Sequence, residues 1–530
     1  MSELSSLPHY VDVLVVGFGP AGAALTNLLG RYGINTLVID KADDVLPMPR
    51  AIALDNEALR ILQMVGLAEN AFNKVAIPQV RLNSPYVGEF GRINTVGCLD
   101  GHPKLVTFYQ PDMEAALRQA LIQYPNIQTL TGVEMQDFID LGHQVQVQLA
   151  LKNGSTHKIC CRYLVAADGA NSAIRTRLGI DFTGETYPQD WLIVDARHVR
   201  KPITDIEFTC DSERPVPHMT APDGRERWEF MLKPEETREQ VLQPEFIRQL
   251  LKPWANPDEL QIERTAVYRF HARVAKQFSK GNVFLVGDAA HITPPFVGQG
   301  LCAGLRDVAN LAWKLALVTQ GKADAKILTS YDQERRPHAK AMIDLARVMG
   351  LLIKPVNPAA GMLSANLVKN LRRLSPVRSL IDELKIKPRN RFSQGLFIAR
   401  NKEAHLDRGN HVAQVWLRDN SANGAWSDDV LGTHFNLVGF GVDPTSYLTK
   451  RQQTAWLAVG GKFLQINPRG QQHHSANNVD IWEDLTGELL PKYAPLGWVA
   501  AIRPDHVVMH DARVEQAHQV IEKSLALLAD

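Results

Sequence analysis

Residues 11–22 read VDVLVVGFGPAG, and they decide how the first part of this chain folds. The apolar run 11–16 predicts a strand, the segment 21–32 predicts a helix, and 35–39 predicts a second strand. In such a unit the first glycine permits a tight turn, the second lets the backbone approach a phosphate, and the third lets helix and strand pack closely. Free N–H groups at the start of the helix favour an anion. The stretch therefore predicts a dinucleotide-binding βαβ unit.

The GxGxxG spacing is weak evidence when it stands alone, because a purely structural glycine turn can have the same spacing. Here the preceding strand and the following helix favour binding. An acidic residue at the end of the second strand can also accept hydrogen bonds from ribose hydroxyls. The predicted cofactor-binding residues of this unit are Gly17, Gly19, Pro20, Ala21, Gly22, Asp40 and Lys41.

Two later motifs extend this prediction. Segment 163–175, YLVAADGANSAIR, ends a strand in Asp168-Gly169, for which an ordinary Asp-Gly turn is the alternative. Segment 287–307, GDAAHITPPFVGQGLCAGLRD, follows an apolar run, and a structural Gly/Pro loop is its alternative. Asp288 can accept a ribityl hydroxyl, and the amides that open the next helix near Gly300 can stabilise negative charge on a reduced flavin. The three motifs in this order predict FAD.

The composition excludes several classes of function. A net charge of +1 gives no basic field for nucleic acid. The five cysteines form no CxxC pair, which argues against a metal site and favours a reducing compartment. No uncharged run approaches the roughly 18 residues that a spanning helix requires. The first residues lack the order of a signal peptide, so the expected location is the cytoplasm, away from membranes.

The order of the predicted elements divides the chain into four regions. Regions 1–180 and 276–390 form an α/β, Rossmann-like FAD-binding domain, which the second region re-enters with one strand and several helices. Region 181–275 is strand-rich and has a hairpin signal at Pro222-Asp223-Gly224, so it predicts an inserted antiparallel substrate-binding sheet. Region 391–530 predicts a small C-terminal α/β domain.

Together the motifs resemble the signature of class A flavoprotein aromatic monooxygenases, the group of p-hydroxybenzoate and phenol hydroxylases. The resemblance is strongest to the 3-(3-hydroxyphenyl)propionate hydroxylases. It weakens after about residue 390, where the tail resembles the thioredoxin-like domain of phenol hydroxylases, which also lacks a redox CxxC. The segments that carry the resemblance are PRAI at 49–52, DNEALR at 55–60, QP at 110–111, WEFM at 228–231, GDAAHITP at 287–294, 310–323 and 333–345.

The resemblance implies an FAD-dependent hydroxylase in which NADH or NADPH binds transiently and reduces the flavin. O2 then adds at flavin C4a, and the hydroperoxide transfers one oxygen atom ortho to a phenolic hydroxyl. The implied substrate is 3-(3-hydroxyphenyl)propionate or a related meta-hydroxyphenyl acid. The loop Pro295-Phe296-Val297 departs from the version typical of the phenylpropionate enzymes. Another phenol or a polyketide-like aromatic is therefore the alternative substrate, and a flavoprotein that only carries electrons is a third interpretation.

The resemblance also implies roles for residues outside the glycine turn. Arg50 and Gln110 would contact the phosphate and ribityl parts of FAD, with a surface ion pair or a turn amide as the alternative for each. The rest of the predicted cofactor set is Asp168, Gly287, Asp288, Pro295, Gly298, Gln299 and Gly300.

A phenol becomes a better nucleophile as it loses its proton, so a nearby base should help. Tyr268 and His271 are candidates for this role, and Pro294 belongs to the wall beside the ring. A substrate carboxylate requires a cation, and Phe296 would contact the substrate ring. A structural role is the alternative for the base and cation candidates. The expected partners are a small phenolic molecule and a second copy in a homodimer, without nucleic acid, membrane or metal. The candidate cations are Arg225, Arg227 and Arg269.

Overall fold

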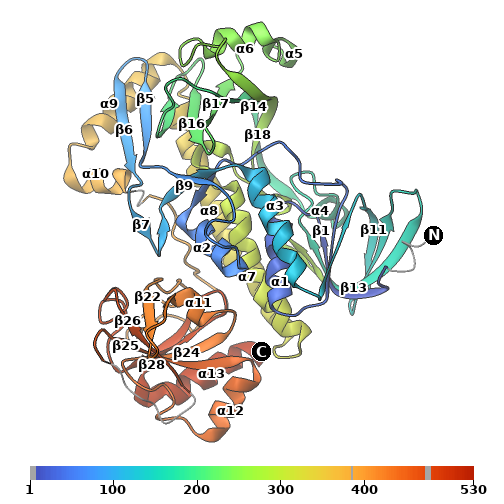
Figure 1. Cartoon of the computed structure of the whole chain (residues 1–530), viewed down its shortest axis with the longest axis vertical. Helices are drawn as coiled ribbons and strands as arrows, with labels where there is room; N and C mark the ends of the chain where they lie inside the picture. Colours follow the sequence, from blue (N-terminus) through green and yellow to red (C-terminus); the bar gives the residue numbers. More distant parts are fainter. Residues whose placement is uncertain (1–6, 384–385, 472–478, 530) are drawn as a thin grey trace.

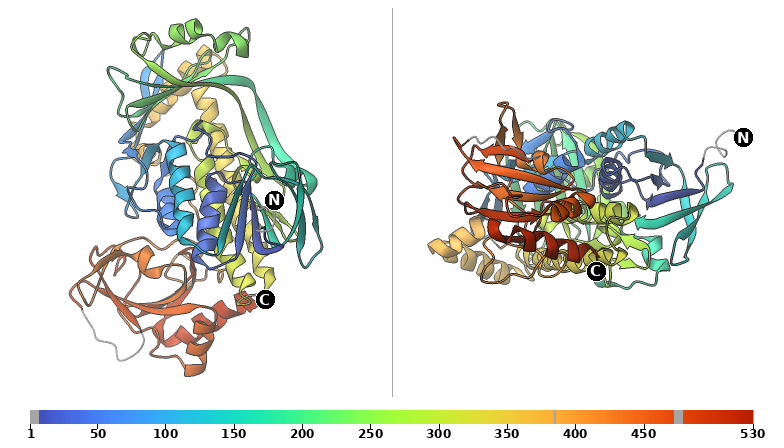
Figure 2. Two further views of the ribbon diagram at one scale, coloured as in Figure 1. Left: turned by 45° about the vertical axis from the view of Figure 1, so that its right-hand side comes forward. Right: turned by 90° about the horizontal axis from the view of Figure 1, so that it is seen from below.

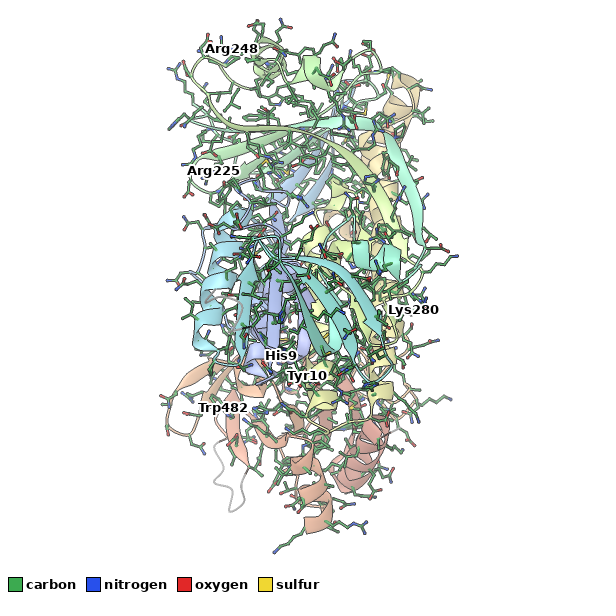
Figure 3. All side chains as sticks on the ribbon, turned by 90° about the vertical axis from the view of Figure 1, so that its right-hand side faces the viewer. His9, Tyr10, Arg225, Arg248, Lys280 and Trp482 are labelled. Atoms are coloured by element: carbon green, nitrogen blue, oxygen red, sulfur yellow. The ribbon has the colours of Figure 1, made fainter. Side chains whose placement is uncertain are left out.

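The computed structural model describes residues 7–383, 386–471 and 479–529 of the chain. Three large sheets follow one another along the long axis of the molecule (Figure 1). Arg248 marks one end and Trp482, in the C-terminal domain, lies toward the other (Figure 3). Within the described ranges, no helix combines the length and the apolar character needed to cross a bilayer.

The first sheet brings together parallel strands from two distant parts of the chain. The strand β20 returns to this sheet after the whole inserted region and pairs in parallel with β13. Two antiparallel strands, β12 and β11, extend the sheet on the same side of β13 as β20, along the first half of β13, whereas β1 lies on its other side. The strands are β10 (Ile127–Thr131), β2 (Thr36–Asp40), β1 (Tyr10–Val16), β13 (Thr156–Ala166), β20 (Val283–Leu285), β19 (Ser279–Lys280), β12 (Val145–Ala150) and β11 (Glu134–Asp140).

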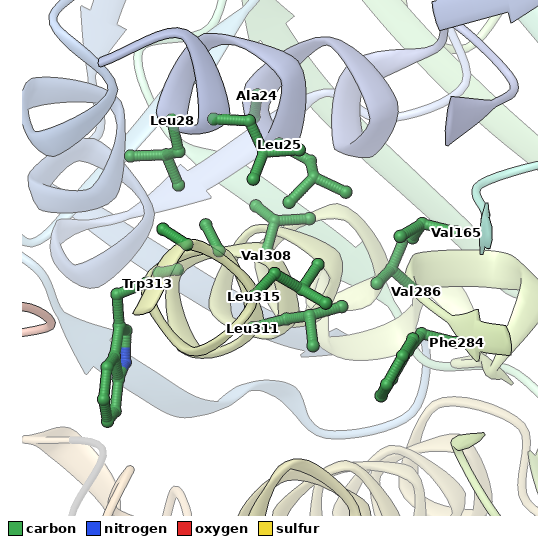
Figure 4. Close-up of a cluster of buried hydrophobic side chains, with 14 of the residues drawn as sticks. Ala24, Leu25, Leu28, Val165, Phe284, Val286, Val308, Leu311, Trp313 and Leu315 are labelled. Atoms are coloured by element: carbon green, nitrogen blue, oxygen red, sulfur yellow. The ribbon is translucent and has the colours of Figure 1, made fainter. Parts of the chain in front are cut away.

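Two helices, α1 (Pro20–Arg31) and α7 (Gly300–Thr319), pack against each other beside this sheet. Leu25 and Leu28 of α1 meet Val308 and Leu311 of α7 in an apolar cluster (Figure 4). All four side chains are buried, and this burial is the main favourable term that holds the helices to the sheet. The packing fixes the first turn of each helix at the same end of the domain. The other helices of this part are α2 (Asn56–Val65), α3 (Gln110–Ala120), α4 (Ala173–Arg177), α8 (Ser330–Ile353), α9 (Pro358–Leu371) and α10 (Ser375–Asp382).

The second sheet is mostly antiparallel and wider than the region 181–275 from which it was predicted. The predicted hairpin at 222–224 is present, but two further strands, β5 and β6, come from the first part of the chain. The long strands β14 and β18 run from the first domain into this sheet (Figure 2). Its order is β21 (His291–Ile292), β18 (Gln261–Ala275), β14 (Phe182–Arg197), β17 (Arg225–Met231), β16 (Val216–Ala221), β15 (Ile206–Thr209), β5 (Gln79–Ser84) and β6 (Gly88–Asn94).

The C-terminal domain is a mixed sheet tied to the first domain by buried ion pairs. Arg503 donates to Glu334 of α8, with Nη1 and Oε1 2.7 Å apart, and both side chains are fully buried. Arg60 of α2 pairs with Asp428 in the same way. The main elements are β24 (Phe435–Phe440), β25 (Gly461–Pro468), β26 (Asp480–Asp484), β27 (Trp498–Ile502), β28 (Val508–Arg513), α12 (Lys450–Ala458) and α13 (Ala517–Ala529).

Candidate active site

One cavity of about 630 Å³ lies between the first and second sheets. One wall consists of the loops that follow β1, β13 and β20 in the first domain. The opposite wall is one face of the second sheet, and residues 386–389, after α10, complete the lining. The fold therefore brings all three predicted motifs to a single cavity.

The turn between β1 and α1 contains two kinds of glycine. Gly17 has a φ of +105°, and a Cβ atom there would lie 2.2 Å from the carbonyl oxygen of Ala167. A Cβ on Gly22 would lie 1.9 Å from the carbonyl oxygen of Gly17. A Cβ on Gly19 would meet no atom within 4 Å. The protein's own packing thus requires Gly17 and Gly22, whereas Gly19, which lines the cavity beside Pro20 and Ala21, leaves space that a ligand can use.

Asp40 is fixed at the end of β2 by backbone donors. Its Oδ2 atom accepts the N–H of Phe18 at 2.7 Å, and its Oδ1 atom accepts the N–H of Ala42 at 2.8 Å. Lys41 is exposed, and neither residue is among those that line the cavity. Asp40 therefore lies beside the glycine turn, at the outer side of the site.

Gln110 holds the segment that carries Arg50 against the cavity. Its Oε1 atom accepts the backbone N–H groups of Arg50, at 2.9 Å, and of Ala51, at 2.7 Å. Its Nε2 atom donates to Glu114 at 2.6 Å. Gln110 and Arg50 both line the cavity, and the Arg50 backbone is fixed while its side chain is exposed.

The loop after β20 presents a half-buried acidic residue to the cavity. Burial raises the pKa of Asp288 above its ordinary value, and this residue lines the cavity next to Gly287. Its neighbour Asp307 accepts the N–H of Gly287 at 3.0 Å and contacts His291 Nε2 at 2.6 Å. Burial would raise the pKa of Asp307, but the charges of His291 and Arg335 lower it. Asp307 thus holds the loop in place through its hydrogen bonds, whereas Asp288 faces the cavity, where it can bind a ligand.

The start of α7 also faces the cavity. Gly298 has a φ of +61°, and Gln299 accepts a hydrogen bond from Arg306 at 3.1 Å. Phe296 is buried and makes edge-to-face contacts with Tyr187, Trp191 and Phe270. The predicted residues that line the cavity here are Pro295, Phe296, Gly298, Gln299 and Gly300, whereas Pro294 is buried outside the lining.

Asp168 has a supporting position in the second motif. Its Oδ2 atom accepts the N–H of Ile174 at 3.3 Å, which ties the end of β13 to α4. Its Oδ1 atom is buried and has no hydrogen-bond partner among the described residues. Burial also raises the pKa of Asp168. Ala167 and Gly169 line the cavity, so Asp168 supports this wall from behind.

The facing wall is assembled by strand register. Val80 of β5 pairs with Ile93 of β6 and with Ile206 of β15, and Ile206 pairs with Met219 of β16. These four side chains point to the same face because directly paired residues share a face. Together with Phe208 and Pro217 they give the cavity an apolar surface that fits an aromatic ring.

Glu229 of β17 is the acidic residue on this wall, and the sequence analysis missed it. It is 6% exposed and lines the cavity. Burial raises its pKa from 4.5 to about 7, a shift that Arg227 opposes and Asp195 reinforces. The signal in the sequence was a single acid between Trp228 and Phe230, which period-two alternation assigns to the opposite face.

The base candidates do not line the cavity. The Tyr268 hydroxyl accepts a hydrogen bond from Arg264 at 2.5 Å. His271 Nδ1 contacts the hydroxyl of Thr186 at 2.9 Å, and burial together with Arg273 and Arg269 lowers its pKa. The expected base role for Tyr268 and His271 therefore does not fit their position, because neither side chain lines the cavity and each already has a hydrogen-bond partner.

The three arginines predicted to bind a substrate carboxylate instead form ion pairs with acidic residues of the protein. Arg227 is buried, pairs with Asp195 through Nε at 2.6 Å, and donates to the carbonyl oxygen of Arg50 at 2.9 Å. Arg269 binds Asp190 at 2.8 Å, and Arg225 binds Glu263 at 2.8 Å. None of the three arginines is part of the cavity lining. The expected carboxylate role does not fit, because each guanidinium already has its anion.

Comparisons with known proteins agree with this architecture. The FAD binding domain family model matches residues 10–346, and the HcaD C-terminal domain model matches residues 409–527. A protein of Burkholderia cenocepacia (strain HI2424) named 3-(3-hydroxy-phenyl)propionate/3-hydroxycinnamic acid hydroxylase is 35% identical over 523 residues, which cover 94% of this chain and 93% of that protein. The protein of the same name from Escherichia coli O139:H28 (strain E24377A / ETEC) is 36% identical over 526 residues, with 98% and 95% covered.

Solved structures share the whole fold. The flavin-dependent monooxygenase PieE, in complex with FAD and substrate, superposes with a TM-score of 0.80 at 22% identity, covering 98% of this chain and 99% of that one. Aklavinone-11 hydroxylase, in a ternary complex with FAD and aklavinone, gives a TM-score of 0.77 at 20% identity, with 98% and 99% covered.

Proposed function

The chain belongs to the class A flavoprotein aromatic monooxygenases, and from this membership we propose that its substrate is 3-(3-hydroxyphenyl)propionate or a closely related meta-hydroxyphenyl acid. The new hydroxyl group enters ortho to the existing one. The names of the relatives support this substrate class, and so does the apolar wall of the cavity. The observation that carries the proposal is that this wall faces the glycine loops across one cavity.

FAD is the cofactor of this enzyme, and NAD(P)H and O2 are consumed with it. The flavin, when bound, supplies the activation of O2 and the transfer of one oxygen atom. The residues present fit FAD, because Gly19 opens onto free space and Asp288 is half-buried at the cavity, where burial raises the pKa of its carboxyl group. We assign the pyrophosphate of FAD to the glycine turn, Gly17, Gly19, Pro20, Ala21 and Gly22, and the ribose to Asp40 and Lys41. The ribityl chain and the adjoining phosphate are assigned to Arg50, Gln110, Asp168, Gly287 and Asp288. The flavin ring is assigned to Pro295, Gly298, Gln299 and Gly300.

The cations that line the cavity support an acidic substrate. Arg389 is exposed, lines the cavity, and has no ion-pair partner in the described part of the chain. Lys104 also lines the cavity and is half-buried, whereas Met219 and Glu229 on the sheet wall are buried. A substrate with a carboxylate on a short chain fits with its ring against the sheet and its carboxylate near Arg389.

A product screen tests this proposal. Purified protein with FAD is mixed with NADH, O2 and, in separate reactions, 3-(3-hydroxyphenyl)propionate, its 4-hydroxyphenyl isomer, 3-phenylpropionate and phenol. We expect the meta-hydroxyphenyl acid to stimulate NADH oxidation most and to give a product that is one oxygen atom heavier. Hydrogen peroxide as the sole product of that reaction, or a clear preference for phenol, would contradict the substrate assignment.

For the C-terminal domain we propose a thioredoxin-like topology without redox chemistry. Parallel β24, β25 and β26 with antiparallel β27 and β28 support this topology. Residues 391–530 contain no cysteine, so no dithiol is available there. A homodimer and a cytoplasmic location stay predictions from the sequence.

A further inference from the structure

The substrate wall carries one buried acid, Glu229, beside a group of apolar lining residues. On β17, Trp228 and Phe230 pack into the core that the sheet forms with α5 (Arg238–Val241) and α6 (Pro244–Leu251). Successive side chains of a strand point to opposite faces, so Glu229 points away from that core and toward the cavity, which it lines. Its cross-strand partner Ile193 and the lining residues Pro217 and Met219 of the adjacent strand β16 offer no polar side-chain group.

The Glu229 carboxylate is not neutralised by an ion pair. No described residue donates a hydrogen bond to it or lies within ion-pair distance, although it is 6% exposed. The charged groups around it are Arg227 on its own strand, Asp195 on β14 and Arg264 on β18. Asp195 binds both arginines, with Arg227 Nε at 2.6 Å and Arg264 Nη1 at 3.1 Å. A buried carboxylate normally has a partner, so the missing donor is expected to come from whatever occupies the cavity.

This position matches what the reaction needs. The phenol becomes more nucleophilic as its O–H bond is weakened, and an acceptor within hydrogen-bond distance of that hydroxyl provides this. Burial raises the pKa of Glu229 to about 7, with Arg227 and Arg264 acting against the shift and Asp195 for it. A base whose pKa lies near the working pH is the effective kind.

Building on the proposed function, we propose that Glu229 is the catalytic residue that accepts the hydrogen bond of the substrate's phenolic hydroxyl. The flavin, when bound, would supply the oxygen atom as OH: the O–O bond of the oxygen donor breaks as the ortho ring carbon bonds to the outer oxygen, and the electron pair stays on the donor's other oxygen, which later takes up the proton that the ring carbon releases. In the same step the phenolic O–H proton moves to the Glu229 carboxylate and the phenolic oxygen becomes a ketone. The ring carbon then loses its hydrogen as a proton to water. Glu229 returns its proton to the ketone oxygen, and the aromatic ring is restored.

The same carboxylate orients the substrate. An ionised Glu229 repels the carboxylate of a hydroxyphenyl acid, while the exposed Arg389 attracts it. The phenolic end therefore enters first and the acid end stays near solvent. This orientation places the ring, rather than the side chain, beside the loop that carries Phe296.

Steady-state kinetics of E229Q, E229D and the control E263Q test this role. Glu263 lies on β18 and pairs with Arg197 and Arg225, away from the cavity, so E263Q should behave as wild type. In the wild type, kcat/KM for 3-(3-hydroxyphenyl)propionate should rise with pH through about 7 as Glu229 ionises. E229Q should lose about 100-fold in kcat/KM and lose this acid limb, and E229D should keep the limb with partial activity.

Calorimetric binding to the FAD-loaded wild type gives a readout that needs no variant. Affinity for 3-(3-hydroxyphenyl)propionate should rise with pH through about 7, whereas affinity for the 3-methoxyphenyl analogue, which has no proton to donate, should not. Equal pH dependence for both ligands, or an E229Q enzyme with an intact acid limb, would overturn the role of Glu229. A wild type that turns over none of the hydroxyphenyl acids would instead contradict the proposed function.

Discussion

The two walls of the cavity are constructed in different ways. The cofactor wall consists mainly of backbone groups, namely glycines at strand ends and the first turns of α1 and α7. Outside the lining, the Asp40 carboxylate accepts a main-chain N–H group of the glycine turn. On the substrate wall, side chains from β5, β6, β15, β16 and β17 meet only because of strand register. The cofactor wall therefore tolerates few substitutions at its glycines, whereas the substrate wall can change its ligand by exchanging side chains.

The largest expected effect concerns the joint between the two walls. Arg227 and Arg264, bound to Asp195 in the second sheet, donate to the carbonyl oxygen of Pro49, next to Arg50 of the cofactor wall. R227M leaves Asp195 with one arginine fewer in a buried site and should lower the free energy of unfolding by roughly 4 kcal/mol. Chemical denaturation measures this change. An R227M protein of normal stability with a raised KM for the hydroxyphenyl acid would show instead that Arg227 binds substrate.

The glycine turn offers a matched pair of substitutions. G22A places a methyl group 1.9 Å from a carbonyl oxygen and should destabilise the protein by about 3 kcal/mol. G19A places the same group in free space, with an ordinary φ of −73°, so the protein should fold normally. The methyl group should nevertheless keep the pyrophosphate away and weaken FAD binding about 100-fold, or ~2.7 kcal/mol. Thermal unfolding and flavin absorbance separate the two effects, and full flavin content in G19A would contradict the assigned cradle.

Glu229 on the substrate wall should lower the free energy of unfolding, by an amount that depends on pH. The pKa of Glu229 rises from 4.5 in the unfolded chain to about 7 in the fold, so its ionisation destabilises the native state as pH increases between these values. In the absence of substrate, E229Q should be more stable than the wild type by about 3 kcal/mol near pH 8, and equally stable near pH 4. A stability difference that does not change with pH would show that Glu229 ionises in the fold as it does in water.

The smallest expected effects concern two arginines, Arg389, which lines the cavity, and Arg269, which does not. R389M should raise KM for 3-(3-hydroxyphenyl)propionate about tenfold, or ~1.4 kcal/mol, because it removes attraction for the carboxylate. R269M serves as the control, since Arg269 is half exposed, binds Asp190 and lies outside the lining. Its loss should change stability by less than about 1 kcal/mol and leave KM unchanged. A higher KM in R269M alone would restore Arg269 as the substrate cation.

The cofactor wall was predictable from sequence because its parts are local. Gly17, Gly19 and Gly22 lie within one turn, and their spacing carries the same meaning wherever a strand and a helix flank it. The loop 287–307 could be assigned because the same short segment supplies Asp288 and the start of α7. Even so, Asp40, Lys41 and Pro294 of these segments lie outside the cavity lining.

The substrate wall was not predictable, because its residues come from strands whose register no local pattern fixes. Region 181–275 was expected to form the sheet alone, yet Val80 and Ile93 arrive from the first part of the chain. The arginine candidates were chosen for their chemistry, but ion pairs with Asp190, Asp195 and Glu263 occupy them. Glu229 stands in the sequence between Trp228 and Phe230, and the sequence does not show which face of this strand lines the cavity. The fold shows that it is the face that carries Glu229.

A crystal structure of the enzyme with FAD and 3-(3-hydroxyphenyl)propionate tests most directly whether the two walls divide cofactor and substrate between them. We predict the pyrophosphate at Gly19, the substrate ring against Ile206 and Met219, its phenolic oxygen within hydrogen-bond distance of Glu229, and its carboxylate near Arg389. A substrate bound with its carboxylate against the second sheet, or a flavin ring lying against Met219, would contradict the account.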